Sequence, residues 1–147
     1  MKFSNLYGLQ PADRIIEPIF QTGLSQHHVI YLGGDDAGVE WIAENYKFKG
    51  VRLVKASDYF LLGKKVRVKK FTGNQAERET AVTRALHLVG APYDLINFNC
   101  EHYAEYVQTR VSSSKQVNIV KEVLVATFAI SVLAMAVKIF SNPKILK

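Results

Sequence analysis

Asn97-Phe98-Asn99-Cys100-Glu101-His102-Tyr103 is the most informative stretch of this chain, and it holds the only cysteine among the 147 residues. Ala104, Tyr106 and Val107 follow at helical spacing, so we expect Cys100 in or just before the first turn of a helix. Unpaired backbone N–H groups and the positive end of the helix dipole favour a thiolate there, and the same N–H groups can hold an oxyanion. Cys100 is therefore a candidate nucleophile if a base lies elsewhere in the chain; a small buried apolar residue is the alternative.

Length and composition limit the classes of protein to which the chain can belong. A chain of 147 residues, 48% of them apolar, is long enough for one domain with a hydrophobic core. A single cysteine excludes an intramolecular disulfide. The four histidines do not have the spacing of a zinc finger, so we expect no metal and no cofactor. The first residues are mixed in polarity, which predicts no signal peptide.

The C-terminal part of the chain differs from the rest in hydropathy. Val123 to Val137 carry no charge, with Lys121 before them and Lys138 after. A helix over residues 118–140 would be long enough to cross a membrane, with lysines near its ends reaching the headgroups. We predict a single C-terminal membrane anchor; a core or dimerising helix is the alternative. The formal net charge of +6 fits nucleic acid or an anionic membrane, and the tail favours a membrane and no nucleic acid.

The first half of the chain is predicted to form an antiparallel sheet. Residues 27–32 and 39–44 are rich in β-branched and aromatic types and flank a glycine-rich turn, so they should form a hairpin. Adjacent strand residues point to opposite faces, so only one of His27 and His28 can face the helix that starts at Cys100. Five segments are predicted strands: 15–20, 27–32, 39–44, 51–54 and 65–71.

Two helices should follow the strands. Asn74 and Glu77 have the spacing of a capping box, and an apolar stripe follows until Gly90 and Pro92 stop the helix. The second helix runs from Cys100 to about residue 109. We expect an irregular lead-in over residues 1–14. The predicted units are a domain over 1–110, a polar linker over 111–117 and the hydrophobic helix over 118–140.

Two segments together resemble those of one known family. His27-His28-Val29-Ile30-Tyr31-Leu32-Gly33 resembles its His-x-x-Ile-Tyr-x-Gly segment, and Asn99-Cys100-Glu101-His102-Tyr103 resembles its Asn-Cys-Glu-His-Phe segment. The family is the lecithin:retinol acyltransferase-like group, which includes the H-rev107-type enzymes, within the NlpC/P60 papain-like clan. The resemblance covers roughly residues 11–110. It implies an α+β, circularly permuted papain-like fold with an antiparallel sheet packed on helices, here followed by the hydrophobic helix.

The resemblance also implies roles for individual residues. Cys100 would be the nucleophile, and His27 its general base, because His27 holds the first position of the first motif. The family usually has a second histidine on the next strand, and residues 39–44 contain none. Glu44 is the best substitute as the orienting residue, with Glu40 and Asn45 as alternatives, since a carboxylate or an amide can also fix an imidazole tautomer.

The reaction that the resemblance implies is acyl transfer through a thioester on Cys100. The substrate would be a phospholipid ester, as in a phospholipase A1/A2-like hydrolase, and water, an alcohol or an amine would accept the acyl group. Two alternatives remain: a papain-like peptidase or amidase acting on cell-wall peptides, and a non-enzymatic membrane-associated module. The tail would hold the domain at a membrane, on the cytoplasmic side.

Overall fold

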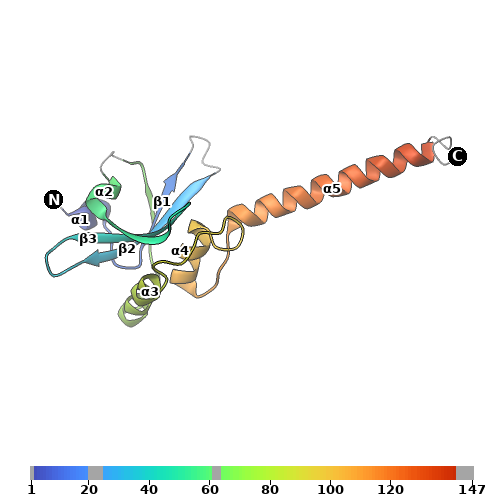
Figure 1. Ribbon diagram of the computed structural model, residues 1–147. Helices are drawn as coiled ribbons and strands as arrows, with labels where there is room; N and C mark the ends of the chain where they lie inside the picture. Colours follow the sequence, from blue (N-terminus) through green and yellow to red (C-terminus); the bar gives the residue numbers. More distant parts are fainter. Residues whose placement is uncertain (1, 20–24, 61–63, 142–147) are drawn as a thin grey trace. The chain divides into compact units, whose positions relative to one another are not determined.

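The computed structural model describes residues 2–19, 25–60 and 64–141, except the side chains of 135–141. The chain divides into two compact units, Met1–Ser114 and Lys115–Lys147. The first unit is an α+β domain, and the second contains one long helix (Figure 1). The elements are α1 (Phe3–Tyr7), β1 (Arg14–Pro18), β2 (Gln26–Gly34), β3 (Glu40–Tyr46), β4 (Gly50–Lys55), α2 (Ala56–Phe60), β5 (Arg67–Lys69), α3 (Gln75–His87), α4 (Cys100–Thr109) and α5 (Lys115–Ser141).

The five strands form one antiparallel sheet in the order β4-β3-β2-β1-β5. Antiparallel pairing brings the end of β1, the start of β2, the end of β3 and the start of β4 to the same end of the sheet. At that end Glu17 pairs with His27, and Tyr46 pairs with Gly50. This end of the sheet carries the candidate catalytic residues.

Helices cover both faces of the sheet, with α1 and α2 on one side and α3 on the other (Figure 1). Strand alternation divides the core accordingly. Ile30 of β2 is buried with side chains of α3 and α4, whereas Val29 and Tyr31 are buried with Tyr59 and Phe60 of α2. The α+β architecture, the antiparallel sheet and the additional apolar helix are confirmed, and they agree with a fold of the NlpC/P60 type.

The predicted elements recur with shifted ends. Asn74 and Glu77 form both hydrogen bonds of a capping box at the start of α3, but that helix ends at His87, before Gly90. Strand β1 ends at Pro18, and the last residue of the predicted strand, Phe20, lies outside the described residues.

Two short helices were not predicted from the sequence. Residues 1–14 are not irregular throughout, because Phe3–Tyr7 form α1. The Glu40 carboxylate accepts the backbone N–H groups of Phe3 at 2.6 Å and Ser4 at 2.8 Å, and the Phe3 ring stacks on Phe60 of α2. Each of these helices has five residues, too few for a helical period to appear in the sequence.

The boundary between domain and tail lies at Ser114, not at Arg110 with a linker over 111–117. The Ser114 side chain is buried, and its hydroxyl donates to Glu101 at 2.6 Å. The next residue, Lys115, begins α5, three residues before the predicted start. Residues up to Ser114 therefore belong to the domain.

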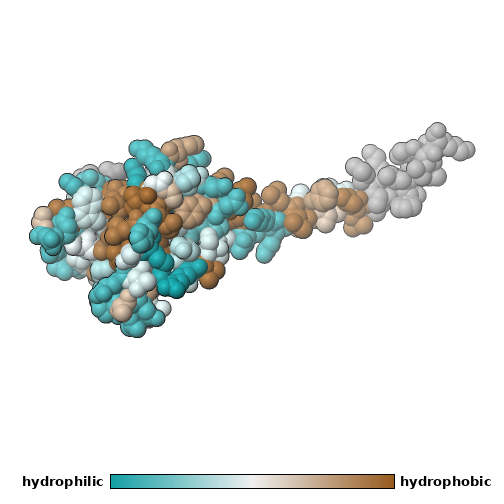
Figure 2. All heavy atoms as spheres, turned by 60° about the horizontal axis from the view of Figure 1, so that its bottom comes forward, coloured by the Kyte–Doolittle hydropathy of each residue, from teal (hydrophilic) through white to brown (hydrophobic). Residues whose placement is uncertain are grey.

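Helix α5 is apolar around its whole circumference. The stretch Lys115–Ala134 is long and apolar enough to cross a membrane by length and composition, and none of it is buried. Brown hydrophobic residues predominate along its described part in Figure 2. A helix that buries one face against a domain would show an apolar stripe instead.

Candidate active site

Cys100 is the first residue of α4, and its side chain is 8% exposed. Asn99 caps this helix, because its Oδ1 accepts the backbone N–H groups of both Glu101 and His102 at 3.0 Å. The expectation that several free N–H groups surround the nucleophile is therefore wrong. The backbone N–H of Cys100 itself is the first-turn donor that Asn99 leaves for an oxyanion.

The two residues after Cys100 stabilise the start of the helix. His102 completes a capping box with Asn99, accepting its backbone N–H through Nδ1 at 3.4 Å. The Glu101 carboxylate accepts the Ser114 hydroxyl and lies 3.8 Å from the Arg14 guanidinium. Both side chains are buried. These contacts fix the helix terminus on which Cys100 lies.

His27 lies between Cys100 and Glu44. Its Nε2 is 2.5 Å from Glu44 Oε2, and Cys100 is near enough to the ring to raise the pKa of His27. Because Nε2 is engaged by the carboxylate, Nδ1 is the nitrogen left for the sulfur. The thiol is also 3.7 Å from the carbonyl oxygen of Gln26, the residue before His27. The start of β2 and the start of α4 thus meet at the sulfur.

Glu44 has a second partner that the sequence analysis did not identify. Arg52, opposite Glu44 on β4, donates from two nitrogens to Glu44 Oε1 at 2.9 and 2.6 Å. The Arg52 guanidinium also lies over the Tyr46 ring, 4.5 Å from its centroid. The carboxylate is thus held by Arg52 on one oxygen and faces His27 with the other.

Glu40 and Asn45, the alternatives to Glu44, have other partners. The Glu40 carboxylate accepts hydrogen bonds from the backbone N–H groups at the start of α1 and from the Tyr31 hydroxyl, the latter at 2.7 Å. The Asn45 amide donates to the carbonyl oxygen of Phe98 at 2.6 Å. Of the three candidates, the structure places Glu44 against His27.

His28 has a separate environment on the opposite face of β2. Its Nδ1 accepts from Arg14 Nε at 2.7 Å, and Arg14 also donates to Glu105 of α4 at 2.6 Å. Burial and the Arg14 charge lower the pKa of His28 well below its ordinary value, so this imidazole is neutral. His27 and His28 do point to opposite faces of β2, as expected. However, both lie near α4: His28 faces the body of the helix, and His27 contacts only its first residue, Cys100.

The charges around His27 favour its protonated form. Burial alone would lower the pKa of His27, but hydrogen bonds and electrostatic attraction from Cys100 and Glu44 outweigh burial and raise it to about 9. Burial would raise the pKa of the Glu44 carboxyl, and the contacts with His27 and Arg52 hold it below its usual value. The arrangement therefore suits a protonated His27 beside an ionised Glu44 carboxylate.

Cys100, His27 and Glu44 line one cleft of about 700 Å³ at the end of the sheet. Tyr93, on the loop before α4, lines the same cleft. Burial and the charge of Cys100 raise the pKa of Tyr93, which keeps its hydroxyl protonated and able to donate a hydrogen bond. The cleft therefore holds a thiol, an imidazole, a carboxylate and a further donor.

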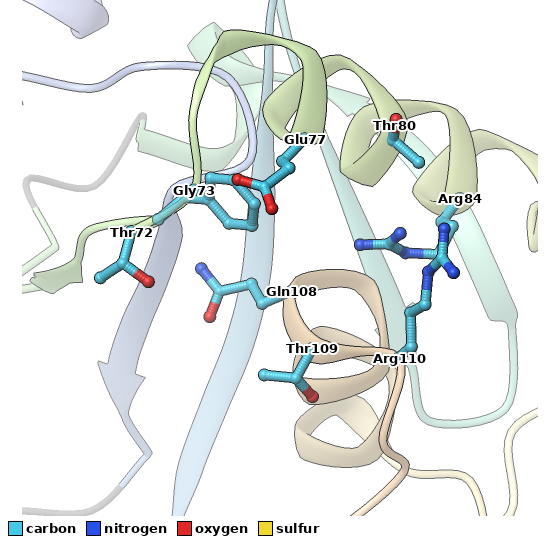
Figure 3. A pocket seen from close by; sticks show the side chains of 9 residues that line it. Thr72, Gly73, Glu77, Thr80, Arg84, Gln108, Thr109 and Arg110 are labelled. Carbon is cyan, nitrogen blue, oxygen red and sulfur yellow. The ribbon is translucent and has the colours of Figure 1, made fainter.

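A second hollow lies between α3 and α4, away from these residues. It measures about 470 Å³, and polar side chains such as Glu77, Arg84, Gln108 and Arg110 line it (Figure 3). Arg84 donates from Nε and Nη2 to the carbonyl oxygen of Val107, near the C-terminal end of α4. None of the predicted catalytic residues lines this hollow. Among the residues that the structure describes, no group of three His, Cys, Asp or Glu side chains could hold a metal ion.

Comparison with known families confirms the family resemblance noted in the sequence. The family model described as lecithin retinol acyltransferase matches residues 10–113, which is most of the first unit. This chain belongs to the lecithin retinol acyltransferase family. The match starts near β1 and ends one residue before Ser114, so it includes both sequence motifs and excludes α5. A comparison with curated proteins found no match.

Membership of the lecithin retinol acyltransferase family supports an acyltransferase or NlpC/P60-like activity in general terms. The histidine strand β2 precedes the cysteine helix α4 in the chain, the order that the resemblance to a circularly permuted papain-like fold implies. The chain has Glu44 beside His27, where the family that it resembles usually has a second histidine. The carboxylate can orient the imidazole by accepting its Nε2–H.

Proposed function

We propose that the domain transfers acyl groups from phospholipid esters through a thioester on Cys100, as an acyltransferase or a phospholipase A-like hydrolase. The observation that carries the proposal is the chain of contacts from Cys100 to His27 and on to Glu44 within one cleft. A thiol, a base and an orienting acceptor are the three parts that nucleophilic catalysis requires.

Acylation begins with the proton of the Cys100 thiol on His27 Nδ1. The thiolate attacks the ester carbonyl carbon, and the carbonyl oxygen becomes an oxyanion. The backbone N–H of Cys100 and the Tyr93 hydroxyl are the donors proposed to stabilise it. The intermediate collapses to a thioester, and the lysophospholipid oxygen takes the proton from His27 as it leaves.

Deacylation reverses the proton transfers. Neutral His27 accepts a proton from water, an alcohol or an amine, which attacks the thioester carbonyl and releases the Cys100 thiolate. Glu44 keeps the imidazole in one orientation during both half-reactions and offsets the positive charge when it is protonated. Helix α5 would anchor the domain on the cytoplasmic side of a membrane, where the phospholipid is concentrated.

The proposal is tested by product analysis with the full-length protein in detergent–phosphatidylcholine mixed micelles. The wild type is expected to release fatty acid and lysophospholipid, and Cys100→Ser is expected to release neither while keeping the wild-type circular dichroism spectrum. Release by the serine variant would remove Cys100 from the mechanism. Cleavage of peptide amides in the absence of ester cleavage would favour the peptidase alternative.

A further inference from the structure

The turn between β3 and β4 carries an exposed phenylalanine in an unfavourable backbone conformation. Lys49 N–H donates to the Tyr46 carbonyl at 3.0 Å, which closes a four-residue turn with Phe48 in third position. Phe48 has a φ of +69° and is 90% exposed. Glycine or asparagine is favoured at such a position, and a bulky residue there is strained. The fold gains no burial from Phe48, so the aromatic ring is not explained by stability.

A second apolar projection lies beside this turn. The loop before α4 exposes Leu95 by 62% and Ile96 by 54%. It is attached to the β3–β4 region because Val51 N–H donates to the Ala91 carbonyl at 2.8 Å and the Asn45 amide donates to the carbonyl oxygen of Phe98. Phe48 and the pair Leu95–Ile96 are thus held on neighbouring segments at the same end of the sheet.

The charge around these apolar side chains is basic. Lys47 and Lys49 flank Phe48, and the Lys47 ammonium lies 5.0 Å from the centroid of its ring. The acidic residue of the neighbouring loop, Asp94, uses its carboxylate to accept the backbone N–H groups of Ile96 and Asn97. Apolar and aromatic tips beside lysines match the interface of a bilayer that contains anionic lipid.

These projections border the entrance of the active-site cleft. Lys47, Tyr93 and Leu95 line both that cleft and an adjoining hollow of about 540 Å³, whose other walls include Phe48 and Lys49. A membrane that contacted the projections would therefore lie directly at the opening to Cys100.

We propose that the turn Tyr46–Gly50 and the loop residues Leu95 and Ile96 form a membrane-docking surface, which places Phe48 among the acyl chains and the lysines at anionic headgroups. The inference rests on the proposed function, because it assigns the way in which the same cleft receives a lipid from the bilayer. Docking by this surface is separate from anchoring by α5: the helix would hold the protein at the membrane, and the surface would orient the cleft.

The chain offers a built-in test of orientation, because its single tryptophan lies at the opposite end of the sheet. Trp41 pairs with Gly33 beside the β2–β3 turn and donates to Asp35 at 2.9 Å. The full-length wild type and the double variant Trp41→Phe, Phe48→Trp each carry one tryptophan, and the two tryptophans lie at opposite ends of the domain. Both are reconstituted in vesicles of phosphatidylcholine brominated in its acyl chains, with and without phosphatidylserine.

Bromine quenching is expected to be strong for the tryptophan at position 48 and weak for Trp41, and the difference should grow with phosphatidylserine. Equal quenching at the two positions would overturn the proposal. If the double variant does not fold, the single variant Phe48→Trp, which keeps Trp41, is compared with the wild type. The additional quenching in the single variant then reports on position 48. This readout needs no catalysis, so it stands or fails independently of the proposed reaction.

A second variant separates docking from folding and chemistry. Phe48→Asn should be no less stable than the wild type, because asparagine tolerates a positive φ. Its hydrolysis of vesicle phospholipid should fall by roughly tenfold, the factor for withdrawing one phenylalanine from an apolar environment. Leu86→Asn, on α3, is the matched control and should keep vesicle activity. Unchanged vesicle hydrolysis by Phe48→Asn, in a protein that cleaves phospholipid, would contradict the docking surface alone.

Discussion

Glu44 Oε2 lies 2.5 Å from His27 Nε2, at the end of the sheet where β2 and β3 are neighbours. The pair replaces the two-histidine arrangement that the family resemblance implies. Arg52 holds the other carboxylate oxygen, so the orientation of Glu44 does not depend on His27 alone. A carboxylate in this position both fixes the imidazole tautomer and stabilises imidazolium.

Glu44→Gln is therefore expected to lower kcat/KM for phospholipid cleavage by about 10²-fold or more, because an amide can stabilise the wrong tautomer of His27 and carries no charge. The same change should lower the pKa of His27, which an NMR titration of its ring protons measures directly. Glu40→Gln is the matched control: it alters a carboxylate that binds α1 and Tyr31 and should leave the pKa of His27 unchanged. A wild-type kcat/KM in Glu44→Gln would exclude Glu44 from the mechanism.

The raised pKa of His27 also predicts how stability depends on pH. The folded value of about 9 exceeds the ordinary value of 6.5, so His27 contributes fully below about pH 6.5, and its contribution is lost as pH rises through 9. The loss is of the order of 3 kcal/mol for a largely buried group. Urea denaturation across this range should show it in the wild type. His27→Gln should lack this part of the decrease, and an identical pH dependence in both proteins would contradict the assignment.

The position of Ser114 predicts where the tail can be removed. A protein truncated after Ser114 should keep the fold and become soluble without detergent, because the residues up to Ser114 form a compact unit of their own and the apolar helix lies in the other unit. Truncation after Arg110 should lower the free energy of unfolding by about 1–3 kcal/mol, since it leaves the buried Glu101 without the Ser114 hydroxyl. Fractionation and urea denaturation measure the two effects. Equal stability of the two truncations would show that the domain ends earlier.

Local sequence signals located much of the candidate site because two of its residues lie at or near the starts of regular elements. Cys100 begins α4 after a capping asparagine, and His27 is the second residue of β2, so each can be placed from a few neighbouring residues. Glu44 could be proposed because it lies on the next strand, but Glu40 and Asn45 could be set aside only when their partners were known.

Other features depend on contacts that local patterns do not encode. Arg52 is one of several charged residues on partly exposed strands, and only the register of β3 with β4 brings it to Glu44. The sequence overstated the number of free N–H groups near Cys100, because Asn99 satisfies two of them. The burial of Ser114 follows from its contact with Glu101, thirteen residues earlier, in a segment whose composition is typical of a linker.

The thioester on Cys100 is the step on which the proposed reaction depends most. Full-length protein would be incubated with phosphatidylcholine whose acyl chains are isotopically labelled, quenched in acid and digested, and the peptide containing Cys100 analysed by mass spectrometry. We predict a mass increase equal to one labelled acyl group on Cys100, removed by neutral hydroxylamine and absent from Cys100→Ala. Glu44→Gln should form the adduct more slowly. Phospholipid cleavage with no adduct on Cys100 in rapidly quenched samples, or cleavage by Cys100→Ala, would contradict the account.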